Sequence, residues 1–151
     1  MTDMKRNAVT LAIFGASFAG AQHHAAPASE KPVALLAGLG TWRHPITTSS
    51  PEAQKFFDQG LTLVYGFNRY EALRSFGKAS ELDPQAAMAY WGMAMALGPY
   101  INMDMDPDVH LKEACDAVNA GLRIAGSHAL ERAWIEAAGA RCPDFSIQRA
   151  R

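Results

Sequence analysis

One spacing of small and bulky residues occurs twice in this chain of 151 residues. Each set places a small, a bulky and another small residue on one helix face, and a helix-breaking residue follows. The sets are Ala72, Phe76, Ala79 and Pro84, then, 42 positions later (114 − 72), Ala114, Val118, Gly121 and Gly126. Such a face lets a helix pack closely against a neighbouring helix. The repetition predicts a stack of similar helical units whose function lies on the surface of the stack.

Composition limits the classes of function. Hydrophobic residues make up 49% of the chain and charged residues 19%, which is enough apolar material for one domain with a core. The formal net charge is −1. A chain with this balance has no basic field for nucleic acid or for an anionic membrane. We therefore expect neither as a partner.

The first 21 residues have the three parts of a signal peptide. Lys5 and Arg6 precede an apolar stretch over 8–18, and the small residues 19–21 precede Gln22. The apolar stretch is shorter than the roughly 20 residues that a membrane span needs. We predict an exported protein, periplasmic or secreted, with no span after cleavage. Residues 22–50 would form a flexible leader and then an extended segment.

Export would place Cys115 and Cys142 in an oxidising compartment, where a disulfide can form. Two unpaired thiols are the alternative, and the spacing leaves both open.

Apolar residues at helical spacing predict five helices, over 52–65, 70–82, 85–97, 109–124 and 127–140. Ser49 or Ser50 can cap the first of these, with Pro51 in its first turn. The third is apolar on almost every side, which indicates a helix packed between others. In the fifth we expect Trp134 and Ile135 to face inward.

The spacing Phe56-x-x-Gln59-Gly60-x-x-Leu63, followed by the first small-bulky-small set, resembles a tetratricopeptide repeat (TPR). The wider sequence is similar to exported bacterial TPR proteins. This resemblance implies an all-α fold of antiparallel helix pairs stacked as a short solenoid. The domain would cover 51–141, with repeats at 53–84 and 87–126, a capping or orphan helix at 127–140 and a tail at 142–151. So short an array implies a truncated member, or self-association through an exposed last helix.

The resemblance also implies a non-catalytic protein–protein interaction module. The first helices of such repeats line a concave groove that holds a peptide or helix. By the family pattern, the groove residues would be Phe57, Leu61, Val64, Trp91 and Met95. The simpler alternative is that these apolar residues belong to the core. No cofactor is implied.

An exported metal-binding protein is the second hypothesis, and it has two candidate sites. After cleavage the chain would begin Gln22-His23-His24, and a free amine with a histidine in third place suits copper or nickel. The second site has the spacing of positions 1, 3, 5 and 12 of a calcium-binding loop, at Asn102, Asp104, Asp106 and Glu113. Pro107 stands where that loop needs glycine.

Catalytic motifs are missing from the sequence. His44 and His110 have no serine, cysteine or carboxylate in a recognisable nucleophile arrangement. The chain contains neither a glycine-rich phosphate loop nor an HExxH motif. We therefore do not expect an enzyme.

Overall fold

The computed structural model describes residues 31–99 and 107–142. The chain divides into two units, Met1–Lys31 and Pro32–Arg151, and all the helices described belong to the second. The predicted signal peptide over 1–21, the histidines at 23 and 24, and tail residues 143–151 lie outside the described residues.

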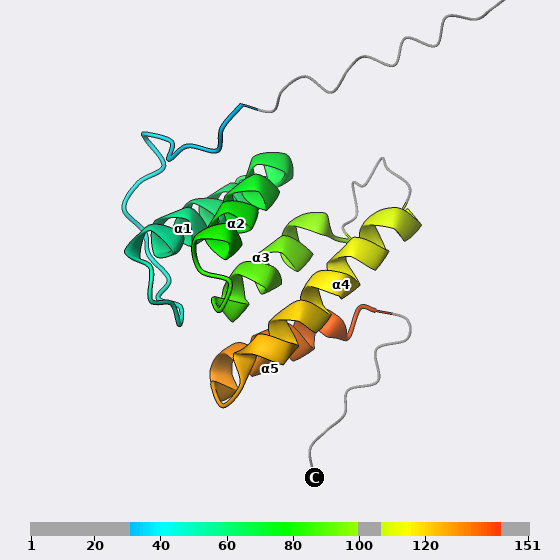
Figure 1. The fold of residues 1–151 in the computed structure, drawn as a ribbon. Coiled ribbons are helices and arrows are strands. Elements are labelled where there is room, and N and C mark those ends of the chain that lie inside the picture. The colour runs from blue at the N-terminus through cyan, green and yellow to red at the C-terminus, as the bar shows by residue number, and fades with distance from the viewer. Residues whose placement is uncertain (1–30, 100–106, 143–151) are drawn as a thin grey trace, which may run out of the picture. The chain divides into compact units, whose positions relative to one another are not determined.

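Five α-helices and no strand are present in the described part of the chain, so the all-helical prediction is confirmed (Figure 1). Their bounds are α1 Pro51–Tyr65, α2 Arg69–Leu82, α3 Ala87–Leu97, α4 Pro107–Ala125 and α5 Ala129–Gly139. The predicted starts of the last three helices were wrong by two residues each. At α3 the reason is visible, because Asp83 accepts hydrogen bonds from the backbone N–H of Gln85 and of Ala86, which form a turn before the helix.

Short polar residues set the ends of the first two helices. Of the two predicted caps, Ser50 is the one observed, because its hydroxyl accepts a hydrogen bond from the Ala53 N–H at 3.1 Å. Pro51 lies in the first turn, as predicted, and is the first helical residue. The Asn68 side chain caps α2 by accepting from the Glu71 N–H. Asp83 ends α2.

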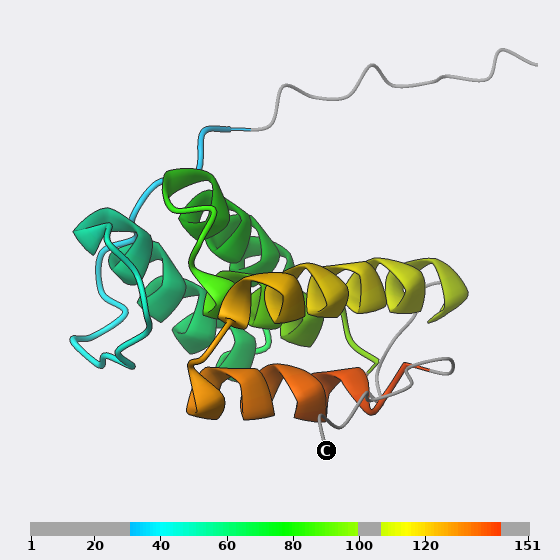
Figure 2. The same cartoon turned by 60° about the horizontal axis from the view of Figure 1, so that its bottom comes forward.

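Helices α1, α3 and α5 form one layer with α3 in the middle, and α2 and α4 each pack against α3. Each helix contacts the next along the chain, and α3 also contacts α1 and α5. Figures 1 and 2 show α4 and α5 side by side from two directions. Helix α3 contacts all four other helices, and this explains why it is apolar on every side.

The repeated small-bulky-small spacing is buried in both α2 and α4. Phe76 is fully buried and lies between Gly60 of α1 and Gly92 of α3. A Cβ added at either glycine would meet the Phe76 ring within 3 Å. Val118 and Gly121 occupy the corresponding positions of α4 and are also buried. The glycines are therefore what allows three helices to approach around one phenylalanine.

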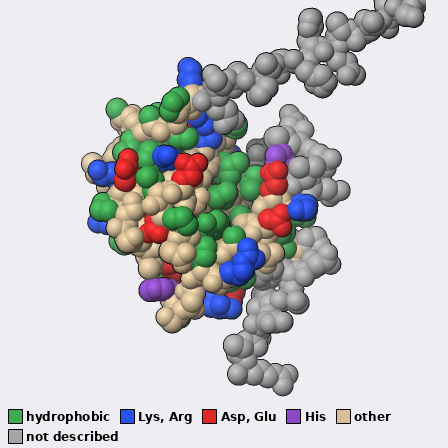
Figure 3. Space-filling view, in the orientation of Figure 1, with side chains coloured by type: hydrophobic (Ala, Val, Ile, Leu, Met, Phe, Trp, Pro, Cys, Tyr) green, Lys and Arg blue, Asp and Glu red, His purple; other side chains and the backbone are tan. Residues whose placement is uncertain are grey.

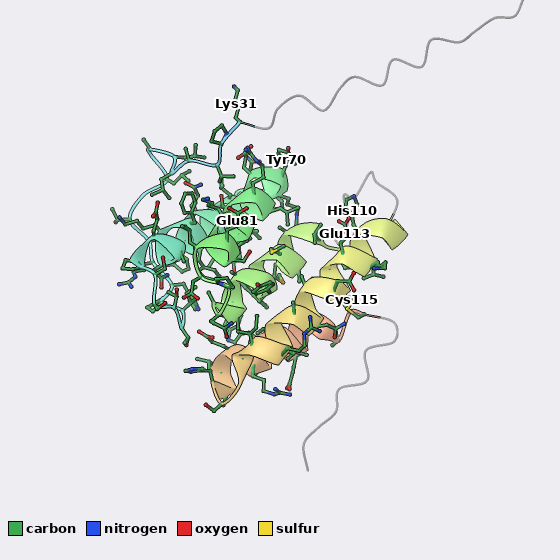
Figure 4. All side chains as sticks on the ribbon, in the orientation of Figure 1. Lys31, Tyr70, Glu81, His110, Glu113 and Cys115 are labelled. Atoms are coloured by element: carbon green, nitrogen blue, oxygen red, sulfur yellow. A yellow bond between two sulfur atoms is a disulfide. The ribbon has the colours of Figure 1, made fainter. Side chains whose placement is uncertain are left out.

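A disulfide joins Cys115 and Cys142, with 5.8 Å between their Cα atoms. This settles the question that the spacing left open. The bond ties α4 to the chain just beyond the end of α5, and Figure 4 labels Cys115 on α4. The chain just beyond α5 is thus linked covalently to α4.

The face turned to the viewer in Figure 3 carries acidic and basic side chains over α2 and α4, with hydrophobic side chains between them. Pairs three or four residues apart join opposite charges along these helices, at Glu71–Arg74, Lys78–Glu81 and Lys112–Asp116. Glu81, Lys112 and Asp116 are exposed, whereas Arg74 is largely covered. Exposed pairs of this kind are typical of the water-facing side of a helix and contribute little to stability.

Candidate binding groove

Helix α3 supplies one wall of the candidate site. It has no charged residue between Ala87 and Leu97. Trp91 is buried, whereas Met95, one turn further on, is only partly buried against the core. Both residues border α5, so the composition of α3 makes this wall apolar.

Helix α5 supplies the opposite wall and has two distinct faces. Ile135 is fully buried, whereas Leu130 is 74% exposed and Trp134 is 40% exposed. The prediction that both residues face inward is confirmed for Ile135, whereas Trp134 is only partly covered, with its ring against Trp91. Successive residues on a helix point about 100° apart, and Ile135 takes the direction of the core.

The two walls enclose an apolar groove with a volume of about 550 Å³. We call it the α3/α5 groove, and its lining residues are Trp91, Met95, Leu130, Ala133, Trp134, Ala137, Ala138 and Arg141. The α5 residues recur at intervals of three and four, which places them on one helix face. The small alanines between Leu130 and Arg141 keep the groove open.

Aromatic contacts connect the groove to the core. The Trp134 ring meets the Trp91 ring edge to face, with centroids 5.3 Å apart. Trp91 in turn lies 6.5 Å from Phe57 of α1, and Phe57 lies 5.5 Å from Phe76. Offset or edge-to-face pairs of this kind stabilise a fixed ring arrangement. The exposed Trp134 indole is therefore held in position by buried rings behind it.

The chain before α1 packs against α1 and against the start of α5. We call residues 33–49 the N-terminal strap. Gln54 donates to the His44 carbonyl at 2.8 Å and accepts from the Ile46 N–H at 3.0 Å. Gln59 makes the same pair of bonds to the Ala34 carbonyl and the Leu36 N–H. Each carboxamide thus binds the carbonyl of one strap residue and the N–H of the residue two positions later. This pair of hydrogen bonds holds the strap against α1.

His44 of the strap lies between α1 and α5. Its ring centroid is 6.2 Å from that of Phe57 and 5.8 Å from that of Trp134. Its backbone N–H also donates to Asp58 at 2.9 Å. The strap therefore covers Phe57, whereas Trp91 and Met95 line the α3/α5 groove.

Asp83, at the end of α2, anchors the end of the strap. Its carboxylate accepts hydrogen bonds from the Thr48 hydroxyl at 2.6 Å and from the Ser49 N–H at 2.9 Å. The Thr48 hydrogen bond, followed by those from Ser49 and Gln85, lowers the pKa of Asp83 below its ordinary value despite the opposing effect of burial. The strap is thereby fixed to the corner between α2 and α3.

The five groove residues predicted from sequence fall into two groups. Trp91 and Met95 line the α3/α5 groove. Phe57, Leu61 and Val64 are buried, with exposures of 0%, 4% and 8%, and do not line it. In this structure the α1 residues contribute to the core behind the groove, which is the simpler alternative considered for them.

Sequence reasoning missed the contribution of α5. Leu130, Ala137 and Arg141 line the groove but were not assigned to it. The signal was present in the sequence. Positions 130, 134, 137 and 141 are spaced by three or four residues, so a helix that includes them carries all four on one face. That face could not be distinguished from a buried one without knowing what packs against it.

A second, more polar hollow of about 400 Å³ lies where the strap meets α5. Glu131 accepts a hydrogen bond from the Thr47 N–H at 2.6 Å, and His128 lies 3.4 Å from the Thr47 hydroxyl. Both polar side chains therefore contact the strap. Their arrangement fixes the strap to the start of α5.

The predicted metal ligands are mostly outside the described residues, namely His23, His24, Asn102, Asp104 and Asp106. Glu113 is described; it is exposed and lies 3.6 Å from His110 one turn earlier. Figure 4 labels both residues on α4. The described side chains, those of residues 31–99 and 110–142, include no group of three or more histidine, cysteine or acidic residues placed to hold a metal.

Among the helices described, none combines the length and the apolar character that crossing a membrane requires. Comparisons of the chain with protein-family models, with curated proteins and with solved structures found no match. The structural argument for function therefore rests on the helices and on the α3/α5 groove.

Proposed function

We propose that this chain is a non-catalytic binding module that holds an apolar segment of a partner protein in the α3/α5 groove. The observation that carries the proposal is the exposure of Leu130 and Trp134 beside the apolar wall of α3. Large apolar side chains held open at the mouth of a groove are typical of sites that bind a partner. An aromatic side chain backed by buried rings can bury area with little loss of conformational freedom.

The fold is proposed to be a short TPR-like solenoid. Its support is the packing of the helices, in which α1, α3 and α5 would be the first helices of successive repeats and α2 and α4 the second. The repeated small-bulky-small face is buried in both α2 and α4, as two equivalent units require. In such a stack the first helices form the binding face, and the α3/α5 groove lies on that face.

The partner is proposed to be a peptide or an amphipathic helix. Helix α3 has 11 residues, so the groove walls run for roughly 16 Å at 1.5 Å per residue. That length accommodates two or three turns of a helix or about five residues of extended chain. Met95 adds a flexible, polarisable side chain that adapts to the shape of a partner. Export, proposed from the N-terminal sequence, would place the partner outside the cytoplasm.

Affinity capture from the exported fraction of the source organism tests this proposal. The bait is the full chain, compared with Leu130→Asp. Tyr65→Asp is the matched control, because Tyr65 is 71% exposed and does not line the groove. All three baits must have the same helical circular dichroism and thermal midpoint. Both altered side chains lie largely in water, so folding should be preserved.

We expect one protein to be retained by the wild-type chain and by Tyr65→Asp, and lost with Leu130→Asp. Capture that is unchanged by Leu130→Asp would place binding elsewhere and refute the groove. Loss with both variants would indicate a general surface effect and would also count against it.

A further inference from the structure

The α3/α5 groove is apolar along its length but charged at one end. Helices α3 and α5 run in the same direction, since Met88 lies near Leu130 and Trp134 while Met95, two turns later, contacts Arg141. Among the residues that line the groove, Arg141 alone carries a charge. The groove therefore has a polarity, with the strap at its beginning and a guanidinium at its end.

Among the described residues, the hydrogen-bond acceptors of Arg141 are neutral. Its Nε donates to the Ala138 carbonyl at 3.3 Å, and its Nη2 lies 3.0 Å from the sulfur of Met95. Among the described side chains, those of residues 31–99 and 110–142, no carboxylate forms an ion pair with Arg141. A thioether is a weak acceptor. The strongest partner for this guanidinium, a carboxylate, is missing from its described surroundings.

A second guanidinium adds to the positive potential at this end. Arg69, from the first residue of α2, donates from Nη1 to the Met95 carbonyl at 2.7 Å. Loss of solvent, and then the positive charge of Arg69, lower the pKa of Arg141. An anion placed beside Arg141 would therefore offset both the loss of solvent around the charge and its repulsion by Arg69.

Arg141 is also held in place. It directly precedes Cys142, whose disulfide to Cys115 fixes this part of the chain to α4. A guanidinium positioned in this way binds a carboxylate with less loss of side-chain entropy than a free surface arginine.

We propose that the groove selects a protein segment in which apolar side chains are followed by an acidic side chain that binds Arg141. This specificity rests on the function proposed above. The apolar side chains would lie against Leu130, Trp134 and Met95, and the Asp or Glu carboxylate would lie at the Arg141 end. Charge complementarity sets the direction of the segment in the groove, because a carboxylate at the strap end would face no cation lining the groove.

Selection from a displayed library of random 12-residue peptides tests the proposal without knowledge of the natural partner. The full chain, Arg141→Gln and Leu130→Asp are screened in parallel. Arg123→Gln is the matched control, because it removes an exposed arginine of α4 that does not line the groove. Enriched peptides are then synthesised with both ends blocked, so that only side-chain carboxylates are present, and in Asp→Asn or Glu→Gln versions.

We expect the wild-type chain and Arg123→Gln to select apolar peptides that carry an acid on one side. Replacing that acid by its amide should weaken binding by about tenfold, the range of a charge-assisted hydrogen bond at a partly exposed site. The same replacement should have little effect on binding to Arg141→Gln. Added salt should weaken only the acidic peptides.

Failure of the two proposals would look different. Peptides that require Leu130 but show no preference for an acid would overturn the specificity and leave the groove function standing. An absence of any Leu130-dependent peptide would overturn both. Tighter binding of the acidic peptide after Asp104→Asn and Asp106→Asn together would assign the acid to the chain itself and would overturn the assignment to a partner.

Discussion

The packing of Phe76 between two glycines makes a strong prediction about stability. A Cβ at position 92 would lie 2.3 Å from the Phe76 ring, and one at position 60 would lie 2.7 Å from it. Phe76 is fully buried and has nowhere to move. Overpacking of this kind destabilises by typically 1–3 kcal/mol. Alanine favours a helix over glycine by about 1 kcal/mol, which offsets part of this cost. We therefore expect Gly92→Ala to lower the free energy of unfolding by up to about 2 kcal/mol.

Gly77 provides the matched control, because no atom lies within 4 Å of a Cβ added there. Gly77→Ala should raise the free energy of unfolding by up to about 1 kcal/mol, through helix propensity alone. The measurement is urea unfolding followed by circular dichroism at 25 °C, with the midpoint compared at constant slope. The two Gly→Ala changes therefore have opposite predicted signs.

A double-mutant cycle identifies the ring as the cause. Phe76→Leu alone leaves space in the core, and the added methyl of Gly92→Ala fills part of it. The double variant should therefore be more stable than the sum of the two single effects predicts, by at least about 0.5 kcal/mol. Additive effects, or a Gly92→Ala chain as stable as Gly77→Ala, would refute the account of the core.

Three further predictions follow from the same structure. Replacing Cys115 and Cys142 with serine should lower the free energy of unfolding by about 3 kcal/mol, since the bond closes a loop over a sequence separation of 27 residues; thermal unfolding with and without reductant checks this, and an unchanged midpoint would contradict it. Because the pKa of Asp83 is lower in the folded state, its stabilisation is present above the ordinary value of 3.8 and is lost as the pH falls below it; Asp83→Asn should therefore show a weaker fall in stability between pH 5 and pH 2 than the wild type, and equal falls would argue against this role. Gln59→Ala should lower stability by about 2 kcal/mol, because Gln59 binds two backbone groups of the strap and the Ser75 hydroxyl; increased hydrogen exchange at the Leu36 N–H would locate the loss in the strap, and unchanged exchange would count against it.

Local chemistry explains why the helices could be predicted from the sequence. The Ser50 cap of α1, the Asn68 cap of α2 and the end of α2 at Asp83 each depend on residues within a few positions of one another. The apolar character of α3 on every side also indicated its central place correctly. Patterns of this kind are set by the 3.6-residue period and by capping, which a single sequence displays directly.

The candidate site could be predicted only in part, because it depends on which helix covers which. Phe57 and Trp91 are both apolar residues of first helices, yet the strap covers one and leaves the other at the groove. The strap is bound by Gln54 and Gln59, and nothing in their spacing indicates a backbone partner far away in the chain. Hydrogen bonds between the strap and α1 therefore determine that Phe57 is covered while Trp91 lines the groove.

The most direct test of the groove is site-specific photo-cross-linking in cells of the source organism. A benzophenone side chain replaces Ala137, which is exposed and lines the groove, or Asn119, which is exposed on α4 and does not. The account predicts that one partner cross-links from position 137 and not from position 119. Cross-linking of the same protein from both positions, or from position 119 alone, would contradict a binding site between α3 and α5.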